Sequence, residues 1–76
     1  MLKINIEFCI KWNYHPEFDR VSKEIKSITN KDVVITANEN PPRTGAFEVF
    51  INGNLVYSKL QKGDFPNRSE ICSWFN

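Results

Sequence analysis

The sequence predicts a small α/β (α+β) domain, in which two helices cover one four-stranded mixed β-sheet. Three observations support this class. Apolar and polar residues alternate at the N-terminus, a helical spacing of apolar residues follows, and an Asn-Gly pair then lies between two β-rich runs. In chain order the elements are β-α-β-β-β-α, and 76 residues suffice for a single domain over residues 1–76.

The first strand and the first helix are predicted by a change of hydrophobic period. Apolar residues alternate with polar ones over residues 2–8, as in a strand with one buried face. From Phe18 to Ile28 the apolar residues recur every three or four positions, and charged residues lie between them. This spacing predicts a helix with one apolar stripe.

Residues at both ends of this helix are consistent with its boundaries. Pro16 fits the first turn, because a missing N–H costs little there. The acids Glu17 and Asp19 suit the positive end of the helix dipole. Asn30 is predicted to end the helix, because asparagine tolerates the left-handed conformation that follows many helices.

The second half of the sheet is predicted from β-rich runs and turn residues. Residues 33–35 are β-branched and predict a strand that lies parallel to the first one, while the proline-containing residues 38–45 predict a loop. Residues 46–60 predict a β-hairpin, because Asn52 and Gly53 supply the positive φ angles of a type I′ turn.

A short helix is predicted within residues 64–75. Asn67 and Glu70 have the spacing of a capping box, which predicts the first turn. Three apolar residues then fall on one face of this helix: Ile71, Trp74 and Phe75. Together with the first helix, this element can cover the sheet.

Composition limits the classes of function. The chain is 41% hydrophobic and has a formal charge of +1, with its basic residues interleaved with acids, so it has no stripe for nucleic acid. Two cysteines are too few for a disulfide-stapled domain, and no apolar run is long enough to form a signal peptide or to span a membrane. We expect a soluble cytoplasmic protein that binds neither nucleic acid nor membrane.

Two blocks of the sequence resemble the selenoprotein W-like proteins, the Rdx family. The block TGAFEVFINGNLVYSKLQKGDFPN, residues 44–67, is similar to a segment that those proteins share. The opening strand followed by CIKWNYHPEF is similar to the beginning of the same family. The resemblance implies a thioredoxin-like fold and a part in cell redox homeostasis.

The family's redox motif is C-x-x-C or C-x-x-selenocysteine, between the first strand and the first helix. Its first cysteine falls on Cys9, the candidate catalytic residue. Its second position falls on Trp12, which has neither a thiol nor a selenol unless a UGA codon has been misread there. The flanking or partner-binding candidates in the same segment are Lys11, Tyr14, His15 and Pro16.

Cys9 has two interpretations. It is either a reactive monothiol, which glutathione or a partner protein resolves, or a chemically silent cysteine at the end of a strand. Lys11 and His15 would favour the thiolate if they faced it. With Trp12 in place of the second thiol, resolution within the motif is impossible.

The alternative function is a non-catalytic protein-binding module with a vestigial redox motif. Here Trp12 and Tyr14 would anchor a partner, because these residue types dominate interface hot spots. Cys72 is expected to belong to the core or to a helix surface, and Cys9 with His15 is too small a ligand set for a metal. We therefore expect no cofactor other than glutathione as a co-substrate, and a monomer or a weak dimer.

Overall fold

The computed structural model describes residues 1–29 and 32–75. Its strands are β1 (Leu2–Phe8), β2 (Val33–Ala37), β3 (Phe47–Ile51) and β4 (Asn54–Ser58). Its helices are α1 (His15–Ile28), α2 (Lys59–Lys62) and α3 (Arg68–Ser73).

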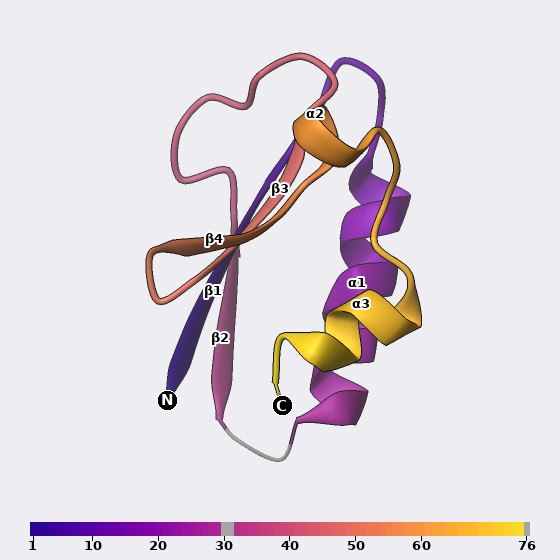
Figure 1. Ribbon diagram of the computed structural model, residues 1–76. Helices are drawn as coiled ribbons and strands as arrows, with labels where there is room; N and C mark the ends of the chain where they lie inside the picture. Colours follow the sequence, from indigo (N-terminus) through magenta and orange to yellow (C-terminus); the bar gives the residue numbers. More distant parts are fainter. Residues whose placement is uncertain (30–31, 76) are drawn as a thin grey trace.

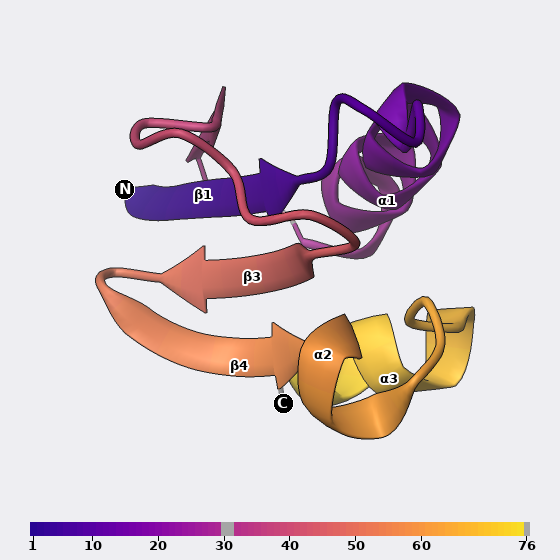
Figure 2. The same cartoon turned by 90° about the horizontal axis from the view of Figure 1, so that it is seen from above.

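The strands form one mixed sheet in the order β2-β1-β3-β4 (Figure 1). β1 pairs with β2 in parallel and with β3 antiparallel, and the β3–β4 hairpin is antiparallel. This arrangement confirms the predicted fold class. Helices α1 and α3 lie on the same face of the sheet, and within residues 1–29 and 32–75 no helix covers the other face (Figures 1 and 2).

The core lies between the sheet and these two helices. Alternate residues of β1 point into it, and Val21 and Ile25 of α1 meet them there. The remaining members of the buried cluster are Phe47, Val49, Tyr57 and Ile71. Each fully buried side chain of this size contributes about 1.5–3 kcal/mol, so the one-sided core is the main source of stability.

Helix α1 begins earlier than the apolar spacing indicates. It starts at His15 and has Pro16 in its first turn, as predicted. Glu17 lies in the first turn, but Asp19 does not; Asp19 instead pairs with the Nδ1 atom of His15 at 3.3 Å. Asn30, the predicted end of this helix, lies outside the described residues.

The hairpin has the predicted turn but a shorter second strand. Asn52 and Gly53 have φ angles of 50° and 85°, as a type I′ turn requires. β4 ends at Ser58, whose side chain caps a one-turn helix by accepting a hydrogen bond from the backbone N–H of Gln61. This helix, α2, ends at Gly63 and was not anticipated from the apolar pattern.

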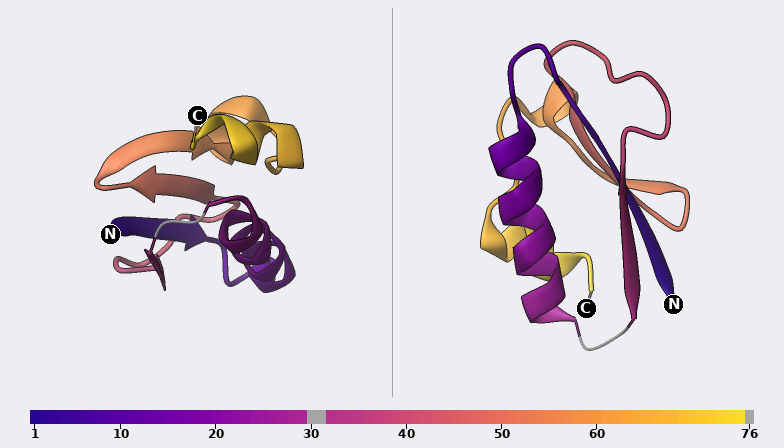
Figure 3. Two further views of the ribbon diagram at one scale, coloured as in Figure 1. Left: turned by 90° about the horizontal axis from the view of Figure 1, so that it is seen from below. Right: turned by 180° about the vertical axis from the view of Figure 1, so that it is seen from behind.

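Helix α3 has the predicted capping box between Asn67 and Glu70. The helix ends at Ser73, and Trp74 and Phe75 pack against the core just beyond it. Arg20 of α1 joins the two helical segments, because its guanidinium donates a hydrogen bond to a backbone carbonyl in the segment before α3. The views from below and behind show α1 and α3 side by side (Figure 3).

Candidate functional site

Cys9 lies directly after β1, where the chain turns toward α1. Its backbone N–H donates to the carbonyl of Ala46 at 3.0 Å, and its carbonyl accepts from the N–H of Tyr14 at 3.0 Å. Its Sγ atom accepts from the N–H of Trp12 at 3.4 Å. The turn before β3 and the loop before α1 therefore fix both the backbone and the sulfur of Cys9.

The surroundings of Cys9 stabilise its thiolate. Burial would raise the pKa of this thiol, but the backbone N–H groups of Gly45, Trp12 and Lys11 and the charge of Lys11 outweigh it. The net effect is a pKa below the ordinary value of a cysteine. N–H groups directed at a sulfur favour the anion, which is the nucleophilic form.

Cys9 is nevertheless only 2% exposed. A thiol with its pKa lowered is more reactive only toward reagents that can reach it. The backbone N–H groups that contact its sulfur come from two loops, one before α1 and one before β3. A reagent can therefore reach the sulfur only if the structure around Cys9 rearranges.

Trp12 covers the turn that contacts Cys9. Its side chain is 56% exposed, and its ring lies against Gly45, where an added Cβ would come within 2.9 Å of the Cζ3 atom. Gly45 has a φ angle of 76°, which suits glycine. The aromatic ring thus occupies space above the backbone amide that helps to stabilise the thiolate.

The other candidate residues near the loop before α1 differ in whether they act on Cys9. The charge of Lys11 is one of the causes that lower the pKa of Cys9. His15 is directed elsewhere, because it pairs with Asp19 and its ring meets that of Phe8 at a centroid distance of 5.7 Å. Pro16 lies in the first turn of α1, where its role is structural.

Tyr14 is half-buried and belongs to an aromatic group below the loop. Its ring packs edge to face on Phe65 at a centroid distance of 4.8 Å and on Trp12 at 6.2 Å. The Nζ atom of Lys59 lies over both Tyr14 and Phe65, 5.2 and 5.4 Å from the ring centroids. Tyr14 therefore connects the loop to the segment after α2 rather than projecting into solvent.

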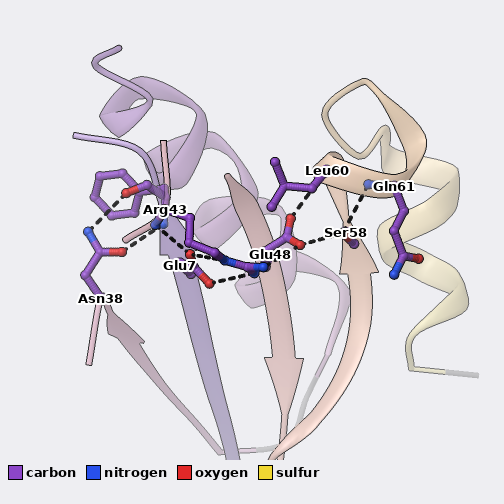
Figure 4. Close-up of polar contacts among 8 residues, drawn as sticks. Glu7, Asn38, Arg43, Glu48, Ser58, Leu60 and Gln61 are labelled. Atoms are coloured by element: carbon purple, nitrogen blue, oxygen red, sulfur yellow. Dashed lines mark hydrogen bonds and ion pairs between the residues drawn. The ribbon is translucent and has the colours of Figure 1, made fainter. Parts of the chain in front are cut away.

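A polar network that the sequence analysis did not predict lies beside the site and joins β1, β3 and the loop before β3 (Figure 4). Glu7 and Glu48 are direct partners across β1 and β3, and Arg43 contacts both carboxylates. Glu48 is 2% exposed and accepts hydrogen bonds from the Ser58 hydroxyl and from the N–H of Leu60. No local sequence pattern indicates this network, because it depends on the β1–β3 register, which places the two acids opposite each other and so calls for a cation nearby.

The rest of the described residues supply neither a disulfide partner for Cys9 nor a metal-binding cluster. Cys9 and Cys72 are both free, and Cys72 is half-buried on α3. Residues 1–29 and 32–75 hold no group of three or more metal-binding side chains. A hollow of about 520 Å³ lies on the face of the sheet opposite α1 and α3, and Cys9 is not among the residues that line it. We therefore place the candidate site at Cys9, because its surroundings stabilise the nucleophilic thiolate.

The comparisons with known proteins agree with this geometry. Residues 3–74 match the model of the Rdx family. The chain belongs to the Rdx family. This confirms the resemblance carried by the two blocks, and it places the chain in a redox-related family.

Two curated Rdx relatives show the extent of the similarity. Selenoprotein W of Danio rerio is 32% identical over 63 residues, which cover 83% of this chain and 72% of that protein. Migration and invasion enhancer 1 of Bos taurus is 30% identical over 70 residues, which cover 92% of this chain and 58% of that protein. The chain thus spans little more than half the length of the latter relative.

Solved structures confirm the fold. A selenoprotein W-related protein from Vibrio cholerae has a TM-score of 0.80 and 24% identity, and the match covers 95% of this chain and 89% of that one. A protein from Bordetella parapertussis also has a TM-score of 0.80, with 20% identity over 95% of this chain and 90% of that one. The fold is therefore thioredoxin-like. Within the part of the chain that the structure describes, no helix has the length and apolar character needed to cross a membrane.

Proposed function

We propose that this protein is a thiol-redox protein in which Cys9 acts as a single nucleophilic thiol. The observation that carries the proposal is the set of backbone N–H groups directed at its sulfur, with the charge of Lys11 beside them. A chemically silent cysteine would have no need of this arrangement. Family membership supports the same chemistry at the same position.

Glutathione is the co-substrate that fits a site with one thiol. The Cys9 thiolate attacks the glutathione sulfur of a glutathionylated partner protein, forms a Cys9–glutathione disulfide and releases the partner's thiolate. The thiolate of a second glutathione molecule attacks the glutathione sulfur on Cys9. This step returns the Cys9 thiolate and forms glutathione disulfide, and the proton of the incoming glutathione ends on the partner's thiol.

The reducing cytoplasm is the compartment that we propose for this cycle. Glutathione is abundant and reduced there, so it can resolve the mixed disulfide that Trp12 cannot resolve. Cys9 and Cys72 are both free thiols in the structure. A role in cell redox homeostasis would follow from this chemistry.

The test measures the reactivity of Cys9 directly. In a Cys72→Ser background, the rate of alkylation by iodoacetamide is followed against pH and compared with that of an unstructured peptide containing one cysteine. We expect an inflection below that of the peptide, because backbone amides and Lys11 lower the pKa of Cys9. Glutathione disulfide should then add one glutathione to Cys9, and the Cys9→Ser variant should not be modified.

Two results would contradict the redox proposal. One is an inflection at or above that of the peptide. The other is a Cys9 that reacts no faster than the peptide cysteine at neutral pH and acquires no glutathione. Either result would leave Cys9 as a structural residue of a redox-related scaffold.

A second function, a protein-binding module, is favoured by the exposure at this end of the molecule. Ile10, Trp12 and Leu60 are exposed apolar residues, while Cys9 is almost completely covered. A hollow of about 370 Å³ near Cys9 is lined in part by Phe8 and Ile10 and could accept an apolar side chain. Under this alternative, Trp12→Ala abolishes binding of a partner and Cys9→Ser does not; under the redox proposal, Cys9→Ser abolishes the mixed disulfide.

A further inference from the structure

Arg43 is held more firmly than its exposed position indicates. Its backbone N–H and its Nε atom both donate to Oε2 of Glu7, at 2.8 and 3.0 Å, and its Nη2 atom donates to Oε1 at 3.1 Å. The Nη2 atom also lies 3.5 Å from Oε1 of Glu48. A guanidinium that binds a carboxylate through two atoms fixes direction as well as distance.

The carboxylates that hold Arg43 are themselves fixed. Glu7 and Glu48 face each other across β1 and β3, and their side chains are 15% and 2% exposed. Two like charges opposite each other destabilise a sheet unless a cation lies between them. Arg43 supplies that cation, so the sheet itself anchors the residue (Figure 4).

The turn that follows Arg43 is the turn that contacts Cys9. The N–H of Ala46 donates to the carbonyl of Arg43 at 3.1 Å and closes the turn, and the carbonyl of Ala46 accepts from the N–H of Cys9 at 3.0 Å. Between them, Gly45 presents its N–H to the thiol beneath the ring of Trp12. Glu7, which holds one end of the turn, and Cys9, which meets the other, are two residues apart.

We propose that Arg43 is a positioning residue for Cys9: clamped by Glu7, it holds the turn of residues 43–46 so that the Gly45 amide is directed at the sulfur. The clamp thereby sets both the acidity of the thiol and its access to reagents. This inference rests on the proposed function of Cys9 as a nucleophile. Lys11, the charged side chain that acts on Cys9 from its own loop, is independent of the clamp.

The test compares two arginines that make similar contacts at different places. Arg43→Met removes the clamp, and Arg20→Met is the matched control, because the Arg20 guanidinium on α1 also binds two carboxylates. Both variants are made in the Cys72→Ser background. Cys9 is titrated through the ultraviolet absorbance of its thiolate, and its alkylation is measured at a pH where it is fully ionised.

We expect Arg43→Met to raise the apparent pKa of Cys9 by up to about one unit, the size of effect of one hydrogen bond to a charged group. The alkylation rate of the fully ionised thiol should rise, because the turn no longer covers it. Arg20→Met should lower the thermal midpoint without changing either readout. A merely structural role for Arg43 would affect the midpoint alone.

Arg43→Lys keeps a cation between the carboxylates but cannot form the bidentate contact. It should give an intermediate pKa, and it serves as the test variant if Arg43→Met does not fold. An unchanged pKa and alkylation rate in a folded Arg43 variant would overturn the clamp, whatever the parent protein shows. A parent Cys9 that titrates like the peptide cysteine would instead overturn the proposed function, so the two failures are distinguishable.

Discussion

Gly45 is the residue on which the geometry of the site depends most directly. Its positive φ angle lets the turn reverse, and its missing side chain lets Trp12 lie on the backbone. Other glycines share the first property but not the second: Gly53 and Gly63 have φ angles of 85° and 84° and no atom within 4 Å of an added Cβ. The three positions therefore separate backbone strain from packing.

Gly45→Ala is expected to destabilise the protein more than Gly53→Ala. The shared positive φ should cost roughly 1–2 kcal/mol in each variant. At position 45 the added methyl group also meets Trp12, which should bring the loss to roughly 2–4 kcal/mol. Chemical denaturation measures the difference. In a double-mutant cycle, adding Trp12→Ala should remove the excess; equal losses for the two alanine variants would refute the contact.

Trp12→Cys is expected to restore a dithiol motif. The backbone N–H of residue 12 already lies 3.4 Å from the Cys9 sulfur, so a side chain at this position starts close to the thiol. In the Cys72→Ser background, mild oxidation should form a disulfide between positions 9 and 12, detected by peptide mapping. Two free thiols after oxidation would show that the loop holds the side chains apart.

For individual residues, the sequence indicated which side chain could react, but not which side chains contact one another in the fold. Cys9 and Trp12 could be located because both belong to one local motif next to a strand. The Arg43 clamp could not, because it joins a strand, a loop and a second strand through a register that no local pattern contains. The partner-binding alternative requires an exposed Tyr14, but this residue is half-buried and packs on Phe65, which is distant in sequence.

Among the elements, β1 connects the sheet to the site. The side chain of Asn38 bonds to both the N–H and the carbonyl of Phe8, at 2.8 and 3.2 Å, and so extends the β2 pairing by one residue. On the other side, Phe8 pairs with Phe47 of β3. The strand is thus held on both sides up to the residue before Cys9.

The ion pair between Glu7 on β1 and Arg43 predicts that the stability of the fold depends on pH. Burial would raise the pKa of Glu7, but the hydrogen bonds and charge of Arg43 bring it below the ordinary value of 4.5. A carboxyl group with a lowered folded-state pKa stabilises the fold above its unfolded-state pKa, and this contribution is lost as the pH falls through the folded-state pKa. Because the pair is partly solvated, the contribution should be about 1 kcal/mol or less.

The Glu7→Gln variant tests whether the contribution of Glu7 to stability is lost as the pH falls. The free energy of unfolding, from urea denaturation at several pH values below about 6, should fall less steeply for the variant than for the parent protein. Arg43→Met should give a similarly flattened curve, because it removes the partner that lowers the pKa of Glu7. Parallel curves for the parent and Glu7→Gln would contradict the assigned ion pair.

Across the whole molecule, the parallel strand pair and the hairpin could be predicted, because each of these connections has few solutions. A strand, a helix and a second strand favour a parallel pair, and the Asn-Gly turn fixes the hairpin. The helix α2 could not be predicted, because it depends on the Ser58 cap and Gly63 rather than on an apolar stripe. Nor does the pattern explain the burial of Glu48, which follows from Arg43 and Ser58.

The ends of the chain have a practical consequence. The start of β1 and the end of α3 lie at one extremity of the molecule, whereas the loop after β1 and the turn before β3 lie at the opposite one (Figure 1). Affinity tags, fluorophores or surface linkers attached at either terminus will therefore be remote from Cys9. Immobilised protein should present the end of the molecule that contains Cys9 to the solution, which suits surface-based capture of mixed disulfides.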